Sequence, residues 1–258
     1  MVMDMKLNKT AVVTGGGTGI GKGIAISLID NGFDVVVTYH SSSTGADEVV
    51  EYAKSKGRIA YGVKADISKL EQINEMFVQI KTHFDHLDLF VNNAGVTMKS
   101  QFLETDEATF DAICDIDYKG SYFCMQAAAK FMVETDTKGS IVVISSNNAI
   151  AHFAGVSVYG SAKAALNKLT EHVAIELAKY GIRVNIISPG WTDTGAARLY
   201  AKQDTYYKIP LKKWTTPKEI ADAVLYLSSD SAVSITGANL VIDNGALLLS
   251  DKGENYGL

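Results

Sequence analysis

Short apolar runs alternate with longer amphipathic stretches along this chain. The apolar runs lack the strict alternation of apolar and polar positions that a half-exposed strand shows. Mainly apolar runs of this length are typical of strands that are buried on both faces of a parallel sheet. The sequence therefore predicts buried strands at 11–13, 35–37, 87–91, 141–144 and 184–187.

The stretches between these runs have the apolar spacing of helices that cover a sheet. They predict helices at 21–30, 45–56, 69–84, 107–133 and 158–179. Alternating strands and helices imply right-handed crossovers, so we expect an α/β fold with a doubly wound parallel sheet of about seven strands flanked by helices. No repeat or linker divides the chain, so one domain is expected for residues 1–258, with a substrate lid at about 190–214.

Composition and charge indicate which classes of binding partner and which cellular location to expect. The chain carries a net charge of -5 and no basic block that would hold a phosphate backbone, which argues against a nucleic-acid partner. No stretch of 18 uninterrupted apolar residues is present, and Met1 to Lys6 lacks the apolar core of a secretory signal. Cys114 and Cys124 are ten residues apart in one predicted helix, about 15 Å along its axis, too far to bridge. We expect free thiols, a cytoplasmic location and no membrane partner.

A glycine-rich loop follows the first predicted strand and opens a helix at Thr14 to Gly21. Glycines let the backbone turn sharply and approach a pyrophosphate, and the helix N-terminus offers free N–H groups to it. Such a loop at the first strand–helix junction is typical of a dinucleotide-binding Rossmann domain. The cofactor contacts expected here are Gly15, Thr18, Gly19, Ile20 and Gly21.

The end of the second predicted strand bears on the choice of cofactor. Dinucleotide folds that bind NAD place an acidic residue there, about 20 positions after the loop, on the ribose 2′-hydroxyl. This chain has Tyr39, His40 and Ser41 instead, and no acid between Val35 and Ala46. Hydroxyls and an imidazole accept a 2′-phosphate that an acid would repel, which favours NADP(H). Because no Arg or Lys stands here, NAD(H) stays open as a second cofactor, and an ordinary polar turn is the alternative interpretation.

Tyr159 and Lys163 lie one turn apart at the start of a predicted helix, so their side chains share a face. A phenol ordinarily keeps its proton well above neutral pH. A nearby ammonium stabilises the phenolate, which allows a tyrosine to act as general acid or base. Ser146 follows the buried run 141–144 and so falls at the carboxyl end of a strand, where open α/β sheets bind ligands. Its hydroxyl is placed to polarise a carbonyl oxygen beside Tyr159.

Taken together, these motifs resemble those of the short-chain dehydrogenase/reductase family, over about residues 9–247. The matching elements are the glycine loop, Asp66-Ile67, Asn92-Asn93-Ala94-Gly95, the trio Ser146, Tyr159 and Lys163, the segment from Arg183 to Gly190, and the C-terminal stretches at 235–237 and 242–245.

The resemblance implies hydride transfer between nicotinamide C4 and an alcohol or carbonyl carbon. It also implies that Lys163 holds the nicotinamide ribose and that a homotetramer forms through two long helices and the C-terminal strand. The further cofactor contacts that it implies are Asp66, Ile67, Asn93, Ala94, Gly95, Tyr159, Lys163, Pro189, Gly190, Thr192 and Thr194.

Asp117 departs from the family pattern, which has an asparagine that kinks the helix and holds a proton-relaying water. An ionised carboxylate cannot donate a hydrogen bond, and burying one is costly unless it is paired. Either Asp117 pairs with Lys163 through water and supports its charge, or the proton relay is impaired. We expect retained activity, with Asp117 among the catalytic residues.

The leading functional hypothesis is an NADP(H)-linked oxidoreductase for a small alcohol or carbonyl compound, such as a sugar, polyol or ketone. A polar rim of Asn147, Asn148, His152 and Asp193 motivates it. The resemblance covers glucose-dehydrogenase-like and 3-oxoacyl-reductase-like members equally, so a 3-oxoacyl-thioester reductase is an alternative. The basic side chains that would dock an acyl carrier protein are Lys202, Lys208, Lys212 and Lys213.

An alternative of another class is a non-catalytic NADP(H)-binding sensor, which only Asp117 supports. No metal site is expected, because His83, His86 and His172 lack ligand spacing and are interpreted as surface residues.

Overall fold

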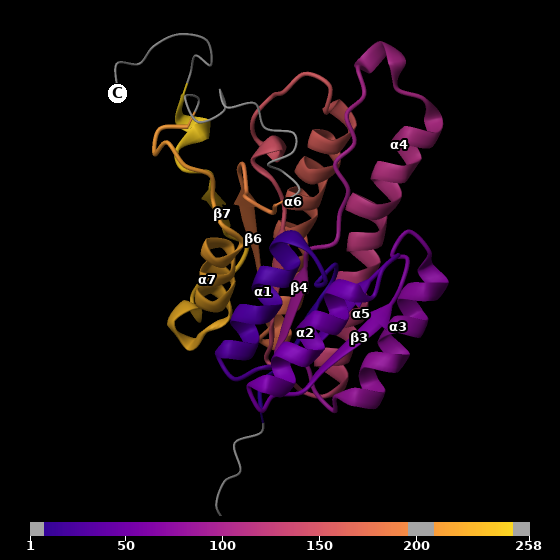
Figure 1. The fold of residues 1–258 in the computed structure, drawn as a ribbon, viewed down its shortest axis with the longest axis vertical. Helices are drawn as coiled ribbons and strands as arrows, with labels where there is room; N and C mark the ends of the chain where they lie inside the picture. Colours follow the sequence, from indigo (N-terminus) through magenta and orange to yellow (C-terminus); the bar gives the residue numbers. More distant parts are fainter. Residues whose placement is uncertain (1–7, 196–208, 250–258) are drawn as a thin grey trace, which may run out of the picture.

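The computed structural model describes residues 8–195 and 209–249, and its centre is a sheet of seven parallel strands (Figure 1). The strand order is β3-β2-β1-β4-β5-β6-β7, the doubly wound arrangement expected from the sequence. The strands are β1 Thr10–Val13, β2 Asp34–Tyr39, β3 Ala60–Lys64, β4 Leu89–Asn92, β5 Ser140–Ile144, β6 Arg183–Pro189 and β7 Asn239–Ile242.

All five apolar runs form strands, with ends shifted by a few residues. β1 and β5 are buried at every position, as strands covered on both faces must be. The pattern did not reveal β3 or β7, because both lie at the edges of the sheet. β3 alternates buried Ala60 and Val63 with more exposed positions, and β7 exposes Leu240 and Val241.

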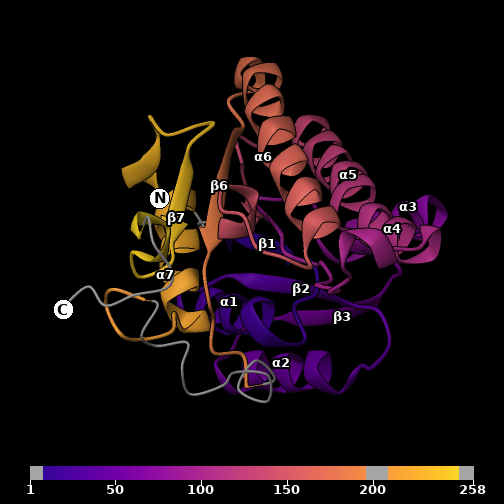
Figure 2. The ribbon, with the colours of Figure 1, turned by 90° about the horizontal axis from the view of Figure 1, so that it is seen from above.

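Helices cover both faces of the sheet, as Figure 2 shows from above. One face carries α1 (Gly19–Asp30), α2 (Thr44–Ser55) and α7 (Pro217–Ser228), and the other carries α3 (Leu70–His83), α5 (Ser121–Glu134) and α6 (Ser157–Leu177). Neighbouring strand residues alternate between the two cores: Val12 packs on the α5 side, and Ala11 and Val13 pack on the α1 side. Short 3-10 turns are η1 Phe102–Glu104, η3 Asn147–Ala149, η4 Ala178–Tyr180, η7 Asp230–Ala232 and η8 Ala246–Leu248.

The helix expected at 107–133 is not one regular α-helix. It consists of α4 (Glu107–Cys114), a π-helical turn η2 (Asp115–Gly120) and α5. The Ser121 hydroxyl donates to the carbonyl of Ile116 five residues earlier, in keeping with the wider turn. A Cβ on Gly120 would lie 2.4 Å from the Ile67 carbonyl oxygen, so the turn needs glycine to pass the loop after β3.

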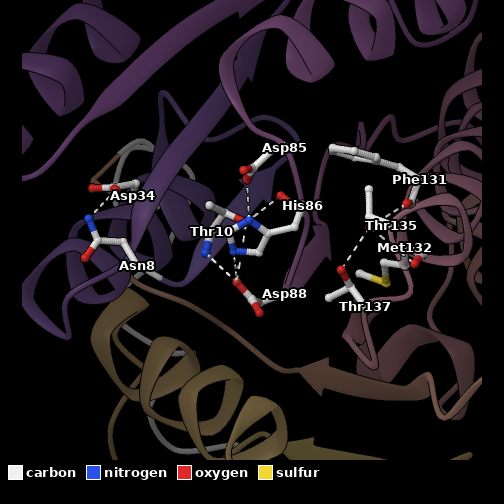
Figure 3. A network of polar contacts seen from close by, with 10 residues as sticks. All are labelled: Asn8, Thr10, Asp34, Asp85, His86, Asp88, Phe131, Met132, Thr135 and Thr137. Atoms are coloured by element: carbon white, nitrogen blue, oxygen red, sulfur yellow. Dashed lines mark hydrogen bonds and ion pairs between the residues drawn. The ribbon is translucent and has the colours of Figure 1, made fainter. Parts of the chain in front are cut away.

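Polar side chains close the amino-terminal end of the sheet (Figure 3). His86 lies between two carboxylates, with its Nδ1 2.6 Å from Asp85 and its Nε2 3.2 Å from Asp88. Thr10 at the start of β1 donates its N–H to Asp88 at 2.7 Å and its hydroxyl to the His86 carbonyl at 2.7 Å. His86 lies near the surface, as predicted, but its side chain is only 18% exposed because these contacts hold it. This end of the sheet is tied together by structural contacts.

The opposite, carboxyl-terminal end holds the switch point between β1 and β4, where open α/β sheets bind ligands. Both cysteines are free, Cys114 half-buried and Cys124 buried. Within residues 8–195 and 209–249, no helix is long and apolar enough to cross a membrane, and no cluster of His, Cys, Asp or Glu could hold a metal ion.

Candidate active site

The glycine loop between β1 and α1 is held from two sides. Gly15 and Gly19 adopt left-handed φ angles of 64° and 52°, which favour glycine. The N–H groups of Gly15 and Gly16 donate to the hydroxyl and carbonyl of Thr38 at 3.2 and 3.1 Å. Sequence reasoning did not single out Thr38, which is buried near the end of β2. Its position at the end of a buried strand was the signal for this role.

The loop after β4 braces the glycine loop from the other side of the switch point. The Asn93 amide donates to the Thr14 carbonyl at 2.9 Å. The Thr14 hydroxyl in turn accepts the N–H groups of Asn93 and Ala94 at 2.9 and 3.0 Å. These contacts place Asn93 and Ala94 beside the loop.

The first turn of α1 has the features of an anion site. It contains no acidic residue, and the Thr18 side chain does not cap it, so backbone N–H groups of Gly19 to Gly21 are available to a ligand. A Cβ on Gly19 would lie 3.3 Å from the Thr194 side chain, so Thr194 reaches over this turn. The residues present therefore fit the pyrophosphate of a dinucleotide.

The expected adenine end lies beyond β2 and β3. Tyr39 is the last residue of β2 and packs partly against the core, whereas His40 and Ser41 are exposed beyond it. His40 Nε2 lies 3.8 Å from the carboxylate of Asp66. Burial disfavours the charged form of Asp66, but the hydrogen bonds from Ser68 and the nearby His40 outweigh it and lower the pKa of Asp66. Ile67 is buried next to it.

Tyr159 and Lys163 lie on the first turns of α6, and Lys163 Nζ is 5.8 Å from the centre of the Tyr159 ring. Lys163 is buried and donates to the Ile144 carbonyl at the end of β5 at 3.4 Å. Ser146 lies two residues after Ile144. Its hydroxyl accepts hydrogen bonds from the backbone N–H and the side-chain amide of Asn148 at 3.1 and 3.2 Å. The turn at η3 packs on α6, because a Cβ on Gly160 would lie 3.1 Å from the Asn148 carbonyl oxygen. The structure thus brings the three predicted catalytic residues to one end of β5.

Asp117 reaches this group from the π-helical turn and contacts Lys163 directly. Its Oδ1 lies 2.8 Å from Lys163 Nζ, and its Oδ2 accepts the N–H of Val96 at 3.1 Å. The expectation of a water-mediated pair is therefore wrong, because the wide turn places the carboxylate itself against the ammonium. Burial disfavours the ammonium, but the negative charge of Asp117 outweighs it and, with Tyr159, raises the pKa of Lys163.

The ends of the predicted lid run side by side. Thr192 and Thr215 form a parallel bridge, and the rings of Trp191 and Trp214 stack with centroids 5.9 Å apart. Pro189 ends β6 beside Ile242, and the Thr192 hydroxyl donates to the Gly190 carbonyl at 3.1 Å. Residues 196–208 of the expected lid, with Lys202 and Lys208, lie outside the described residues, so the lid stays a prediction.

The predicted polar rim is only partly present. Asn147 is buried, and its amide lies 3.3 Å from where a Cβ on Gly190 would be. Asn148 is half-buried and bonded to Ser146, whereas His152 is exposed. Sequence reasoning missed the backbone N–H of Val96, which holds the second oxygen of Asp117 and which no side-chain pattern reveals.

Comparison with known proteins decides which family has this arrangement. A family model described as enoyl-(acyl carrier protein) reductase matches residues 15–246. The chain belongs to the short-chain dehydrogenase/reductase family. Its Rossmann-type fold and the order of its motifs agree with this assignment.

Relatives of this short-chain dehydrogenase/reductase include enzymes whose names state different substrates. It is 34% identical over 246 residues to the 3-oxoacyl-(acyl-carrier-protein) reductase FabG of Staphylococcus aureus, which covers 93% of this chain and 99% of the relative. It is 36% identical over 252 residues to glucose 1-dehydrogenase 2 of Bacillus subtilis, at coverages of 95% and 97%.

Among solved structures, acetoin dehydrogenase from Enterobacter cloacae superposes with a TM-score of 0.89 at 34% identity, covering 96% of this chain and 100% of that one. The protein is accordingly an oxidoreductase that uses a nicotinamide dinucleotide and acts on alcohol or carbonyl groups.

Proposed function

We propose that this enzyme interconverts a small polar alcohol and its carbonyl compound, such as a sugar, polyol or ketone, with NADP(H) as its cofactor. The observation that carries the proposal is the placement of Tyr159 and Lys163 on one face of α6, with Nζ 5.8 Å from the phenol ring, beside Ser146 at the end of β5.

The proposed roles follow from the chemistry of each group. Tyr159 gives its proton to the carbonyl oxygen during reduction and takes it back during oxidation. The Ser146 hydroxyl donates a hydrogen bond to the same oxygen and polarises it. When bound, the nicotinamide supplies or accepts the hydride. Lys163 keeps its ammonium beside the phenol and holds the nicotinamide ribose.

The glycine loop and the loop after β4 would hold the rest of the cofactor. The first turn of α1 presents N–H groups to the pyrophosphate, and Thr194 covers it. Asp66 and Ile67 would border the adenine. Pro189, Gly190 and Thr192 would border the nicotinamide, together with Asn93, Ala94 and Gly95.

The preference for NADP(H) is supported by the exposed side chains beyond β2. His40 is 72% exposed and free to turn toward a phosphate, with Ser41 next to it. Asp66 lies 3.8 Å from His40 and would disfavour a nearby phosphate if the imidazole were removed. His40 is therefore the side chain on which the preference depends.

Replacing His40→Asp tests this preference. We expect the ratio of kcat/KM for NADPH over NADH to fall at least about tenfold, since a second carboxylate would repel the 2′-phosphate. His172→Asp, the same change at an exposed position of α6, serves as the control and leaves the ratio unchanged. An unchanged ratio in His40→Asp would contradict the assignment of this side chain to the 2′-phosphate.

Initial rates of NADPH oxidation on a panel of sugars, small ketones and diketones test the substrate class. We expect turnover on small polar carbonyl compounds that does not depend on ionic strength.

The alternative, 3-oxoacyl-thioester reduction, is favoured by the 34% identity to a 3-oxoacyl-(acyl-carrier-protein) reductase. It predicts higher kcat/KM on a carrier-bound 3-oxoacyl chain, falling steeply with salt, because Lys212 and Lys213 would dock the acidic carrier. Such a result would replace the proposed substrate class.

A further inference from the structure

The buried ion pair between Asp117 and Lys163 goes beyond what the family motifs require. Asp117 is fully buried and Lys163 is 3% exposed, and the two charged atoms are 2.8 Å apart. Burying two charges is costly, and attraction offsets that cost only when the geometry is good and the other lone pairs are satisfied. Here the Val96 N–H satisfies the second carboxylate oxygen. The pair is thus a built feature of the site rather than a surface contact.

The ammonium of Lys163 has three N–H groups. Its nitrogen lies 2.8 Å from Asp117 Oδ1 in an ion pair and donates to the Ile144 carbonyl at 3.4 Å. At least one N–H is left for a ligand, so Lys163 can still hold a ribose hydroxyl while it is paired. Asp117 therefore fixes the position of the lysine without excluding the cofactor.

The pair also changes the electrostatics around Tyr159. A phenolate next to a lone ammonium in a buried site is strongly stabilised, because nearby charges interact more strongly when they are screened from water. A carboxylate in contact with that ammonium repels the phenolate and cancels part of the effect. The charges of Asp117 and Lys163 sum to zero, so Tyr159 faces a dipole rather than a full positive charge.

We propose that Asp117 is a positioning residue that holds Lys163 and keeps Tyr159 as a neutral phenol at neutral pH, which sets this site for carbonyl reduction. The inference rests on the proposed function. A reduced nicotinamide bound here would supply the hydride for the new C–H bond as the C=O π bond breaks. The Tyr159 O–H bond then breaks to give its proton to that oxygen, and the phenolate recovers a proton from solvent. Alcohol oxidation needs the phenolate first and so is expected to require a higher pH.

The other charged and titratable groups near the pair do not replace Asp117 in this role. From α6 the pair faces Tyr159, and β5 and the loop after β4 contribute backbone groups, the Ile144 carbonyl and the Val96 N–H. On α4, burial and then the charges of Asp111, Asp115 and Asp117 raise the pKa of Cys114, so its thiol stays neutral. Asp115, on the same turn as Asp117, is 36% exposed and pairs with Lys119 at 3.1 Å.

Ultraviolet titration of the protein without cofactor tests the inference directly. The absorbance of tyrosinate near 295 nm is followed with pH, and the Tyr159→Phe titration is subtracted to isolate Tyr159. We expect no phenolate signal from Tyr159 at pH 7.5 in the wild type. Asp117→Asn, compared with Asp117→Asn/Tyr159→Phe, should move the midpoint to lower pH by about one unit. Asp115→Asn removes the same charge two residues away and should leave the midpoint in place.

The pH dependence of alcohol oxidation gives the matching kinetic test. The acidic limb of kcat/KM should move to lower pH in Asp117→Asn by a similar shift and stay unchanged in Asp115→Asn. A merely structural role for Asp117 would lower the rate without moving this limb.

A phenolate signal at pH 7.5 in the wild type overturns the inference, and this measurement does not depend on any Asp117 variant folding. An unchanged or higher midpoint in a folded Asp117→Asn protein, checked by near-ultraviolet circular dichroism, overturns it as well. Absence of turnover on every carbonyl compound would count against the proposed function alone, because the titration tests Asp117 without substrate.

Discussion

At the scale of single residues, the spacing of Tyr159 and Lys163 was enough to predict that they share a helical face. The position of Ser146 at a strand end was equally predictable from the sequence, because a buried apolar run precedes it. The direct contact between Asp117 and Lys163 was not predictable. It depends on a π-helical turn, whose i to i+5 geometry leaves no spacing signal in an otherwise regular amphipathic pattern.

Gly95 is a position at which an added side chain would contact the ion pair of Asp117 and Lys163. A Cβ there would lie 2.5 Å from Asp117 Oδ1 and 3.1 Å from Lys163 Nζ. We expect Gly95→Ala to push the two charges apart, to cost about 1–3 kcal/mol of stability as overpacking does, and to lower kcat/KM roughly tenfold. Thermal unfolding and initial rates measure the two effects.

Gly62→Ala is the matched control, because its Cβ would meet only side-chain atoms of Ala46 and Tyr39, at 3.3 Å and beyond. Gly95→Ala with wild-type rate and stability would show that the pair is not held as tightly as the distances indicate.

At the scale of elements, the strands buried on both faces were predictable and the edge strands were not. A central strand such as β5 must be apolar throughout, whereas β3 and β7 meet solvent and mix polar with apolar residues. The polar contacts at the strand ends could not be predicted from the sequence either. His86 looked like a surface histidine because its partner Thr10 lies 76 residues away in the sequence.

The contacts of His86 predict how stability depends on pH. Partial burial disfavours the imidazolium, but the hydrogen bond that His86 donates to Asp85 and the charges of Asp88 and Asp85 outweigh it and raise the pKa of His86. A pKa raised in the folded state adds stability below the unfolded value, and this stability is lost as pH rises through the folded value. The melting temperature of wild type should therefore exceed that of His86→Asn by more at pH 5.5 than at pH 8.5.

A double-mutant cycle separates this ion-pair effect from lost packing. In an Asp85→Asn/Asp88→Asn background, the His86→Asn change should cost nearly the same at both pH values. A difference between pH 5.5 and 8.5 that persists in that background would contradict the assignment to the two carboxylates.

At the scale of the molecule, two apolar surfaces could serve as contacts in the homotetramer that the family resemblance implies. A groove of about 630 Å³ runs along the outer side of α4 and α6, lined by Phe110, Tyr118 and Val158 among others. The α6 residues that line this groove, such as Val158, lie on another side of the helix from Tyr159 and Lys163. The groove is therefore away from the catalytic face. The edge strand β7 exposes Leu240 and Val241. The sequence implied these surfaces only through the family resemblance. Which apolar side chains are exposed depends on the whole fold.

Light scattering after size exclusion measures the assembly. We expect a mass of about 111 kDa, four times the 27.8 kDa of one chain, as closed symmetric tetramers give. Val241→Lys should reduce the mass, because a charge would be buried at the β7 contact. Leu70→Lys, a similar change at a 42% exposed position on α3, should not. A wild-type protein that elutes at the mass of one chain would rule out the tetramer.

The most direct test of the whole account is the rate of NADPH-dependent carbonyl reduction by Tyr159→Phe, measured with NADPH affinity on the same samples. Tyr180→Phe is the control, because Lys179 lies 5.0 Å from the Tyr180 ring in a similar but exposed pair. Loss of the proton donor should lower kcat by roughly 10²–10⁴-fold, with NADPH affinity within about threefold of wild type, while Tyr180→Phe keeps the wild-type rate. Wild-type turnover by Tyr159→Phe would contradict the assignment of proton transfer to Tyr159.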